Sequence, residues 1–166
     1  MCIETPFKQF NPDTFHMPIL IVKLIHEKNI INPICVVDSG ADFCTLPMES
    51  GKSLGIDFKK TAPKEILKKW LYLDKKDQKR VNELVEDAIK NKYAIPTSYE
   101  CACGEITKAY YYPVTIEIEK RFKEDILVLW TPANSMSLLG RIGILDKIEE
   151  LAFKKDKLFV IRFKKG

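Results

Sequence analysis

The chain has 166 residues and a formal net charge of +4, with 46% hydrophobic and 30% charged residues. This balance is typical of a folded globular protein and excludes an intrinsically disordered chain. A chain of this length can bury a sizeable core within one domain, so neither a disulfide nor a metal is needed to explain folding.

Lysines are spread along the chain and mixed with Asp and Glu, which is typical of a solvated surface. The nearest approach to a basic stripe lies at residues 154–157 and 164–165, so we expect no nucleic-acid partner. Residues 1–13 lack the regions of a signal peptide, and the apolar stretch 17–25 is far shorter than the ~20 residues that span a bilayer. The cysteines are odd in number and lack a secreted-scaffold spacing. We therefore expect a cytoplasmic protein with no membrane partner.

Two strands are predicted in the first part of the chain. Residues 19–25 are rich in branched side chains, a turn follows at 27–29, and Ile34–Val37 is a continuous apolar run typical of a fully buried strand. This second strand runs directly into Asp38 and Ser39. Turn residues at the end of a buried strand are a common position for catalytic groups.

Residues 63–93 are predicted to be a helical insertion. Apolar residues recur there at helical spacing, namely Val81, Leu84, Val85, Ala88 and Ile89. Asp74 is expected to cap this helix, a shorter helix is expected at 66–71, and Pro96 ends the segment. The apolar stripe must be buried against something. The sequence leaves open whether it packs on the rest of the domain, forms a lid or extends a dimer interface.

The second half of the chain returns to strands. Alternation over 110–118 predicts a strand with one inward face, and residues 126–130 predict a strand buried on both faces. Residues 142–151 are expected to form a short helix, and Leu158–Phe163 a closing strand. The predicted fold class is mainly β, in one domain spanning residues 1–166.

Two motifs are decisive in combination. The first is two apolar residues followed by Asp38, Ser39, Gly40 and Ala41, with Leu46 and Pro47 soon after; the second is Leu138, Leu139, Gly140 and Arg141. In this order the motifs resemble those of the retropepsins, the single-lobe aspartic peptidases of retroviruses and their cellular relatives. The resemblance covers roughly residues 18–56 and 101–163 and omits the insertion, which is foreign to minimal retropepsins. It implies a retropepsin-like acid-protease β-barrel with a short C-terminal helix.

The resemblance also implies roles for individual residues. Asp38 is the catalytic carboxylate, Ser39 bonds across a dimer axis, and Gly40 allows close approach of the backbone. Asp42 and Arg141 form an ion pair, although Ile142 stands where many relatives carry Asp or Asn. Gly140 and Ala41 complete the support of the site. A substrate-covering flap is expected at Cys101, Ala102, Cys103, Gly104 and Glu105.

Peptide hydrolysis without a metal or a covalent nucleophile needs an activated water and a proton for the carbonyl oxygen. Two carboxylates that share one proton supply both, because like charges about 3 Å apart cannot both ionise. One chain carries one such motif, so the second carboxylate is expected from a two-fold-related copy. The expected function is a homodimeric aspartic endopeptidase that acts on polypeptides and needs no cofactor. Because Ala41 cannot donate a hydrogen bond to the carboxylates, an optimum nearer neutral pH than that of gastric enzymes is expected.

Other interpretations remain open from sequence. The same fold with a blocked cleft or a lost dimer would be a non-enzymatic peptide-binding module, and a Lys-rich nucleic-acid binder is a third reading. Residues 50–53 end like a phosphate-binding loop, but Leu46 stands where that motif needs Gly. Cys101 and Cys103 lack zinc spacing, so no metal is expected. The tyrosines at 110–112 either pack within a strand or line a substrate groove.

Overall fold

The computed structural model describes residues 2–6, 17–74, 76–100, 104, 106–132, 136–154 and 158–164. Its strands form two sheets, one with three strands in the order β1–β12–β11 and one with nine. The small sheet contains β1 (Cys2–Pro6), β11 (Ile148–Lys154) and β12 (Leu158–Phe163). The large sheet follows the order β2–β5–β10–β6–β9–β8–β3–β4, with β7 added beside β8.

The bounds of the remaining elements follow the same chain order. The first strands of the large sheet are β2 (Ile19–Ile21), β3 (Lys23–His26), β4 (Asn29–Ile31), β5 (Ile34–Val37) and β6 (Cys44–Pro47). The helices are α1 (Met48–Ser53), α2 (Lys64–Leu71) and α3 (Gln78–Asn91). The later strands are β7 (Ile95–Glu100), β8 (Ile106–Ile118), β9 (Phe122–Thr131) and β10 (Leu138–Leu139).

The long hairpin of β8 and β9 is the backbone of the large sheet. Its register runs from the pair Tyr110 and Trp130 to the pair Ile118 and Phe122. Trp130 is fully buried, and its indole nitrogen donates to the carbonyl of Tyr112 at 3.2 Å. Its ring therefore packs in the core while its one polar group stays hydrogen-bonded, as burial of an indole requires.

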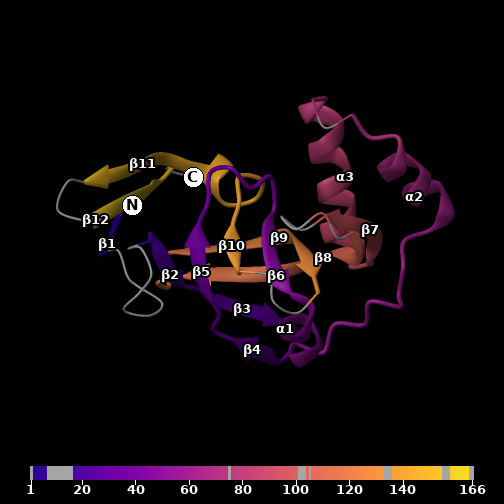
Figure 1. The fold of residues 1–166 in the computed structure, drawn as a ribbon, viewed down its shortest axis with the longest axis horizontal. Helices are drawn as coiled ribbons and strands as arrows, with labels where there is room; N and C mark the ends of the chain where they lie inside the picture. The colour runs from indigo at the N-terminus through magenta and orange to yellow at the C-terminus, as the bar shows by residue number, and fades with distance from the viewer. Residues whose placement is uncertain are drawn as a thin grey trace.

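A single hydrophobic cluster joins the two sheets. It contains Ile3, Phe159 and Ile161 of the small sheet together with Leu24 and Val128 of the large one. Burial of such a side chain contributes about 1.5–3 kcal/mol relative to exposure. In Figure 1 the small sheet lies at one end of the molecule, and the helices α2 and α3 lie at the other.

Helix α3 packs on the large sheet, and helix α2 does not. The buried stripe of α3 is the one that helical spacing predicts, namely Val81, Leu84, Val85 and Ala88. It belongs to a second cluster with Tyr111 and Leu127 of the long hairpin. No residue of α2 is buried. The alternative of packing on the rest of the domain therefore holds for α3, whereas α2 stands apart from the sheet.

The cap expected at Asp74 is wrong. The helix begins three residues later, and the Asp77 side chain accepts from the backbone nitrogen of Arg80. Asp74 instead accepts from the backbone nitrogen of Lys76 in the preceding turn. Both aspartates have cap chemistry, and the apolar stripe alone does not fix the first turn.

Two other boundaries differ from expectation. The strand expected at 19–25 is split into β2 and β3, because Val22 donates from its nitrogen to Pro33 rather than continuing either ladder. The helix expected at 142–151 is confined to a short 3₁₀ turn, Leu145–Lys147, after which β11 begins. Ile142 bridges to Phe43, and Gly143 has a φ of +93°, so the backbone cannot enter an α-helix there.

Surface features agree with a limited basic tail. Lys154 pairs with Glu4, and Lys164 donates to the carbonyl of Asp146 at 2.7 Å, whereas the other lysines of the tail lie outside the described residues. Residues 50–53 belong to α1 and its packing against Phe58 and Trp130 at Gly51, not to a phosphate loop. Within the described ranges, no helix is long and apolar enough to cross a membrane.

Candidate active site

Asp38 begins the loop that joins β5 to β6. Its backbone nitrogen donates to the carbonyl of Leu139 at 3.0 Å, which ties the start of the loop to β10. Its carboxylate oxygen Oδ1 accepts from the nitrogen of Gly40 at 2.8 Å, and its carbonyl accepts from the nitrogen of Ala41 at 3.3 Å. The loop therefore closes on its own first residue, and this closure fixes the direction of the Asp38 carboxylate.

Strand β10 lies between β5 and β6, which are neighbours in the sequence. Leu138 and Leu139 pair in parallel with Val36 and Val37, and Leu138 also pairs with Thr45. The two sequence motifs, about 100 residues apart, thus meet side by side in one sheet.

Gly140 is the point of closest approach between the two motifs. A Cβ added there would lie 2.4 Å from the carbonyl carbon and oxygen of Phe43 and 2.9 Å from the carbonyl oxygen of Ala41. Beyond it, the nitrogen of Arg141 donates to Ala41 at 2.9 Å, and the nitrogen of Ile142 donates to Asp42 at 2.8 Å. Only glycine fits this approach, and the two hydrogen bonds fasten the Asp38 loop to the chain after β10.

Asp42 and Arg141 form the ion pair that the resemblance implies. Their side chains are 42% and 60% exposed, so the pair contributes little stability, within about 0–1 kcal/mol. It acts together with the backbone bonds between the same two segments. The pair therefore orients the end of the Asp38 loop more than it stabilises the fold.

The Asp38 loop forms one wall of a cavity of about 390 Å³. Asp38 is half-buried, whereas Ser39 and Gly40 are exposed. A Cβ on Gly40 would lie only 3.2 Å from Asp38 Oδ1, so a larger residue would crowd the carboxylate. The rest of the wall is mainly apolar and consists of Phe43, Thr45, Tyr99, Tyr111, Leu129, Met136 and Leu138, besides Ala41 and Asp42.

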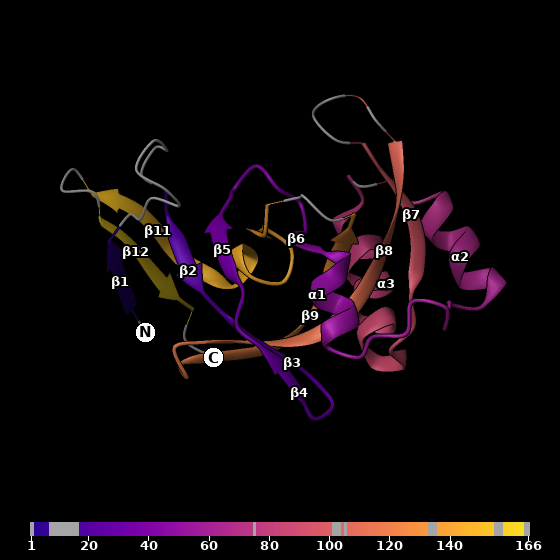
Figure 2. The ribbon, with the colours of Figure 1, turned by 60° about the horizontal axis from the view of Figure 1, so that its bottom comes forward.

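A hairpin stands over this cavity where the flap is expected. Strands β7 and β8 pair antiparallel as far as Glu100 and Ile106. Figure 2 shows the two strands projecting beyond the rest of the sheet. Of the expected flap residues, Cys101, Ala102, Cys103 and Glu105 lie outside the described residues. Gly104 is exposed with a φ of +83°, a conformation that glycine adopts without strain.

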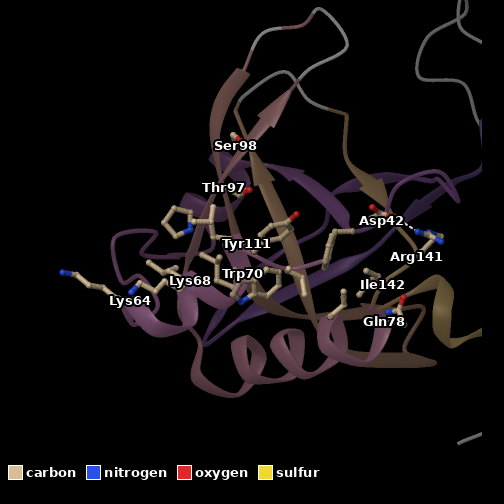
Figure 3. A pocket seen from close by; sticks show the side chains of 17 residues that line it. Asp42, Lys64, Lys68, Trp70, Gln78, Thr97, Ser98, Tyr111, Arg141 and Ile142 are labelled. Atoms are coloured by element: carbon tan, nitrogen blue, oxygen red, sulfur yellow. Dashed lines mark hydrogen bonds and ion pairs between the residues drawn. The ribbon is translucent and has the colours of Figure 1, made fainter. Parts of the chain in front are cut away.

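A second and larger cavity of about 640 Å³ adjoins the first. It lies between the helical insertion and strand β7, and Figure 3 shows the side chains around it. Asp42, Phe43 and Tyr111 line both cavities. Burial, together with the negative charge of Asp42, raises the pKa of Tyr111 to about 12. The Tyr111 phenol is therefore neutral and available as a hydrogen-bond donor over the ordinary pH range.

Other ionisable groups near the loop are inert by burial. Burial raises the pKa of Cys44 to about 12, and burial followed by the neighbouring Cys44 also raises the pKa of Cys35. Cys44 Sγ accepts from the nitrogen of Gly140 at 3.4 Å, a packing contact behind the catalytic loop. Among the described residues, no three His, Cys, Asp or Glu side chains are placed to share a metal ion.

Neither a family model nor a curated protein matches this sequence. A solved structure does match, the crystal structure of a retropepsin-like aspartic protease from Rickettsia conorii. The likeness covers 97% of this chain and 91% of that chain, with a TM-score of 0.51 and 18% sequence identity. The chain has a retropepsin-like fold. At this level of identity the likeness establishes the fold and not the activity.

Within the retropepsin-like fold, sequence reasoning located the Asp38 loop and missed most of the surrounding wall. Phe43, Tyr99 and Met136 carry no local signal, since they reach the cavity from three separate segments. The tyrosine run at 110–112 did carry a signal. Tyr111 faces the cavities, whereas Tyr112 faces the core and hydrogen-bonds His26 at 3.2 Å, so the two open interpretations of that run apply to different residues.

Proposed function

We propose that the chain is one half of a homodimeric aspartic endopeptidase, with Asp38 of each subunit forming the catalytic pair. The observation that carries this proposal is the position of Asp38. Its carboxylate is half-buried on the wall of a cavity beneath a projecting hairpin, in a loop fastened at Gly140. The retropepsin-like fold supports the assignment, because the two motifs meet in it as a retropepsin requires.

In the proposed reaction, a water molecule lies between the two Asp38 carboxylates, one of which is protonated. The ionised carboxylate removes a proton from the water as the oxygen attacks the peptide carbonyl carbon, and the protonated carboxyl donates to the carbonyl oxygen. Collapse of the tetrahedral intermediate breaks the C–N bond, and a proton passes to the leaving amine. The hydrogen bond from Gly40 keeps Oδ1 in place during both proton transfers.

Dimer formation is part of this mechanism, because each chain brings one carboxylate. Ser39 and Gly40 are exposed beside Asp38, where a two-fold axis would place the partner loop. The small sheet has β1 and β11 at its edges, and an edge strand can pair with a strand of a second chain. Both features favour a symmetric association through the active-site end of the molecule and its terminal strands.

The substrate is an extended polypeptide. Tyr99, Leu129 and Met136 give the Asp38 cavity an apolar wall suited to apolar side chains. The hairpin of β7 and β8 would close over the bound chain and exclude water from the carboxylates. A non-enzymatic peptide-binding module would use the same wall without needing Asp38, so the two functions differ in what loss of this carboxylate does.

The proposal is tested by hydrolysis of denatured casein by wild type and by Asp38→Asn, scanned from acid to neutral pH. Asp57→Asn is a matched control, because Asp57 Oδ1 accepts from the nitrogen of Lys59 in the same local turn but lines neither cavity. We expect cleavage by wild type and the control, none by Asp38→Asn, and inhibition by a peptide with a central hydroxyl in place of the scissile bond. Equal behaviour of all three proteins would leave the binding module as the function.

A further inference from the structure

The larger cavity has the character of a binding site for an apolar side chain. Its walls come from α2, the start of α3 and strand β7, and its apolar residues include Leu67, Leu71, Leu73, Val81 and Ile95. The rings of Trp70 and Tyr111 stack there, with centroids 5.5 Å apart and planes inclined by 25°. A cavity of about 640 Å³ between such rings has room for an aromatic side chain and its backbone.

This cavity is reached from the Asp38 cavity. Asp42, Phe43 and Tyr111 belong to both walls, and the rings of Phe43 and Tyr111 lie 4.8 Å apart as the partition between them. A polypeptide lying across Asp38 therefore passes this partition within a few residues of the scissile bond. The continuity with the proposed catalytic cleft identifies the occupant as part of the substrate chain.

The charges around the cavity are unequal at its two ends. Figure 3 shows Asp42 and Arg141 at one end and Lys64 and Lys68 at the other. Asp42 and Arg141 compensate each other in their ion pair. Lys64 and Lys68 are four residues apart on one face of α2, and among the described residues neither forms an ion pair. The end remote from Asp38 is therefore positive and suits a carboxylate.

One polar group of the wall is unpaired. The indole nitrogen of Trp70 is buried and has no hydrogen-bond partner among the described residues. A buried donor left without an acceptor is destabilising, so it favours a ligand that brings an acceptor such as a peptide carbonyl. The unpaired donor is a second observation, independent of the lysines, that points to a bound polypeptide.

We propose that the helical insertion forms a specificity subsite that takes an aromatic side chain of the substrate between Trp70 and Tyr111 and an adjoining acidic residue at Lys64 and Lys68. This inference rests on the proposed function and deepens it. The insertion then acts neither as a blocking lid nor as a dimer contact. It selects which segments of an unfolded chain enter the Asp38 cleft in productive register, in the way that binding of remote groups supports orientation at the reacting bond.

The test measures binding without turnover, in the Asp38→Asn background. The probes are fluorescein-labelled peptides that differ only at one pair of residues, Phe-Glu, Phe-Lys or Ala-Glu, and binding is followed by anisotropy. We expect the Phe-Glu peptide to bind at least about fivefold more tightly than either counterpart. Lys64→Glu with Lys68→Glu is expected to reverse the Glu-over-Lys preference. Trp70→Phe, which keeps a stacked ring and removes the donor, is expected to weaken all Phe peptides.

Lys60→Glu with Lys69→Glu is the matched control. These lysines are exposed, Lys69 lies on the same helix, and neither lines a cavity, so the net charge changes equally. The control is expected to keep the preference for Phe-Glu. Equal affinity for the three peptides, or loss of preference in the control as well, would overturn the subsite. If a second copy of the chain fills the cavity instead, the Lys64 and Lys68 reversals change the dimer dissociation constant and leave peptide preference unchanged, which also overturns it.

The result separates this inference from the proposed function. Cleavage of casein by wild type, with no preference among the peptides, would leave the endopeptidase standing and remove the subsite. A Phe-Glu preference that depends on Lys64 and Lys68, with no cleavage by wild type under any condition, would support the subsite and overturn the endopeptidase.

Discussion

Replacement of Gly140 by Ala directly perturbs the joint between the two motifs. The added methyl group would lie 2.4 Å from the backbone carbonyl of Phe43, whereas ordinary contacts begin at 3.4 Å. The segments must therefore separate by about 1 Å, because neither neighbour is a flexible side chain. This movement stretches the bonds from Arg141 to Ala41 and from Ile142 to Asp42.

The size of the effect follows from these contacts. Overpacking costs about 1–3 kcal/mol, and each weakened backbone hydrogen bond removes up to about 0.5–1.5 kcal/mol. We expect a loss of about 3 kcal/mol in the free energy of unfolding, which for a domain of this size lowers Tm by roughly 6–12 °C. Gly104→Ala, where nothing lies within 4 Å of the added carbon, is expected to cost only about 1 kcal/mol for its positive φ.

Thermal and urea unfolding at one fixed protein concentration measure both variants, because association changes apparent stability. In the protein that remains folded, casein cleavage by Gly140→Ala should fall well below that by Gly104→Ala, since the Asp38 loop is displaced. A Tm of Gly140→Ala within about 2 °C of wild type would show that the close approach at this joint is not a structural constraint.

Three further predictions concern the insertion and buried groups near the active-site loop. Asp77→Ala should cost about 1 kcal/mol through loss of the α3 cap, and Asp74→Ala clearly less; equal urea midpoints would contradict the cap assignment. Because the pKa of Tyr111 is raised to about 12, the unfolded chain loses this proton first as pH rises. Stability present below about pH 10 should therefore decline between pH 10 and 12, by about 1 kcal/mol at pH 11, and Tyr111→Phe should remove that part of the decline. Iodoacetamide at pH 8 should label Cys35 and Cys44 only after unfolding, as peptide mass mapping would show, and labelling of either in the native protein would refute their inertness.

Local apolar patterns predicted several strands with correct bounds. Ile34–Val37 and Leu158–Phe163 are each a continuous or alternating apolar run between turn residues, and both form strands with those limits. The helical stripe of α3 was equally clear, since its buried positions follow one face. These signals are local, so the sequence around each element is sufficient to specify it.

Other features depend on tertiary contacts and carry weak local signals. Residues 142–151 have apolar spacing that fits a helix, but Ile142 is held by Phe43 and Gly143 turns the chain into β11. Strand β10 has two residues and exists because β5 and β6 accept it between them. The cavity beside Trp70 depends on where α2 stands relative to β7, a relation that no spacing within α2 specifies.

The central claim is that two copies of Asp38 make one active site, and mixed dimers test it most directly. Wild type and Asp38→Asn are unfolded together in varied proportions, refolded at constant total concentration so that subunits combine at random, and assayed on casein. If a site needs both carboxylates, activity follows the square of the wild-type fraction, so an equal mixture retains about one quarter of the wild-type activity. Retention of about one half, in a straight line with the wild-type fraction, would mean that each chain carries a complete site and would contradict the shared pair.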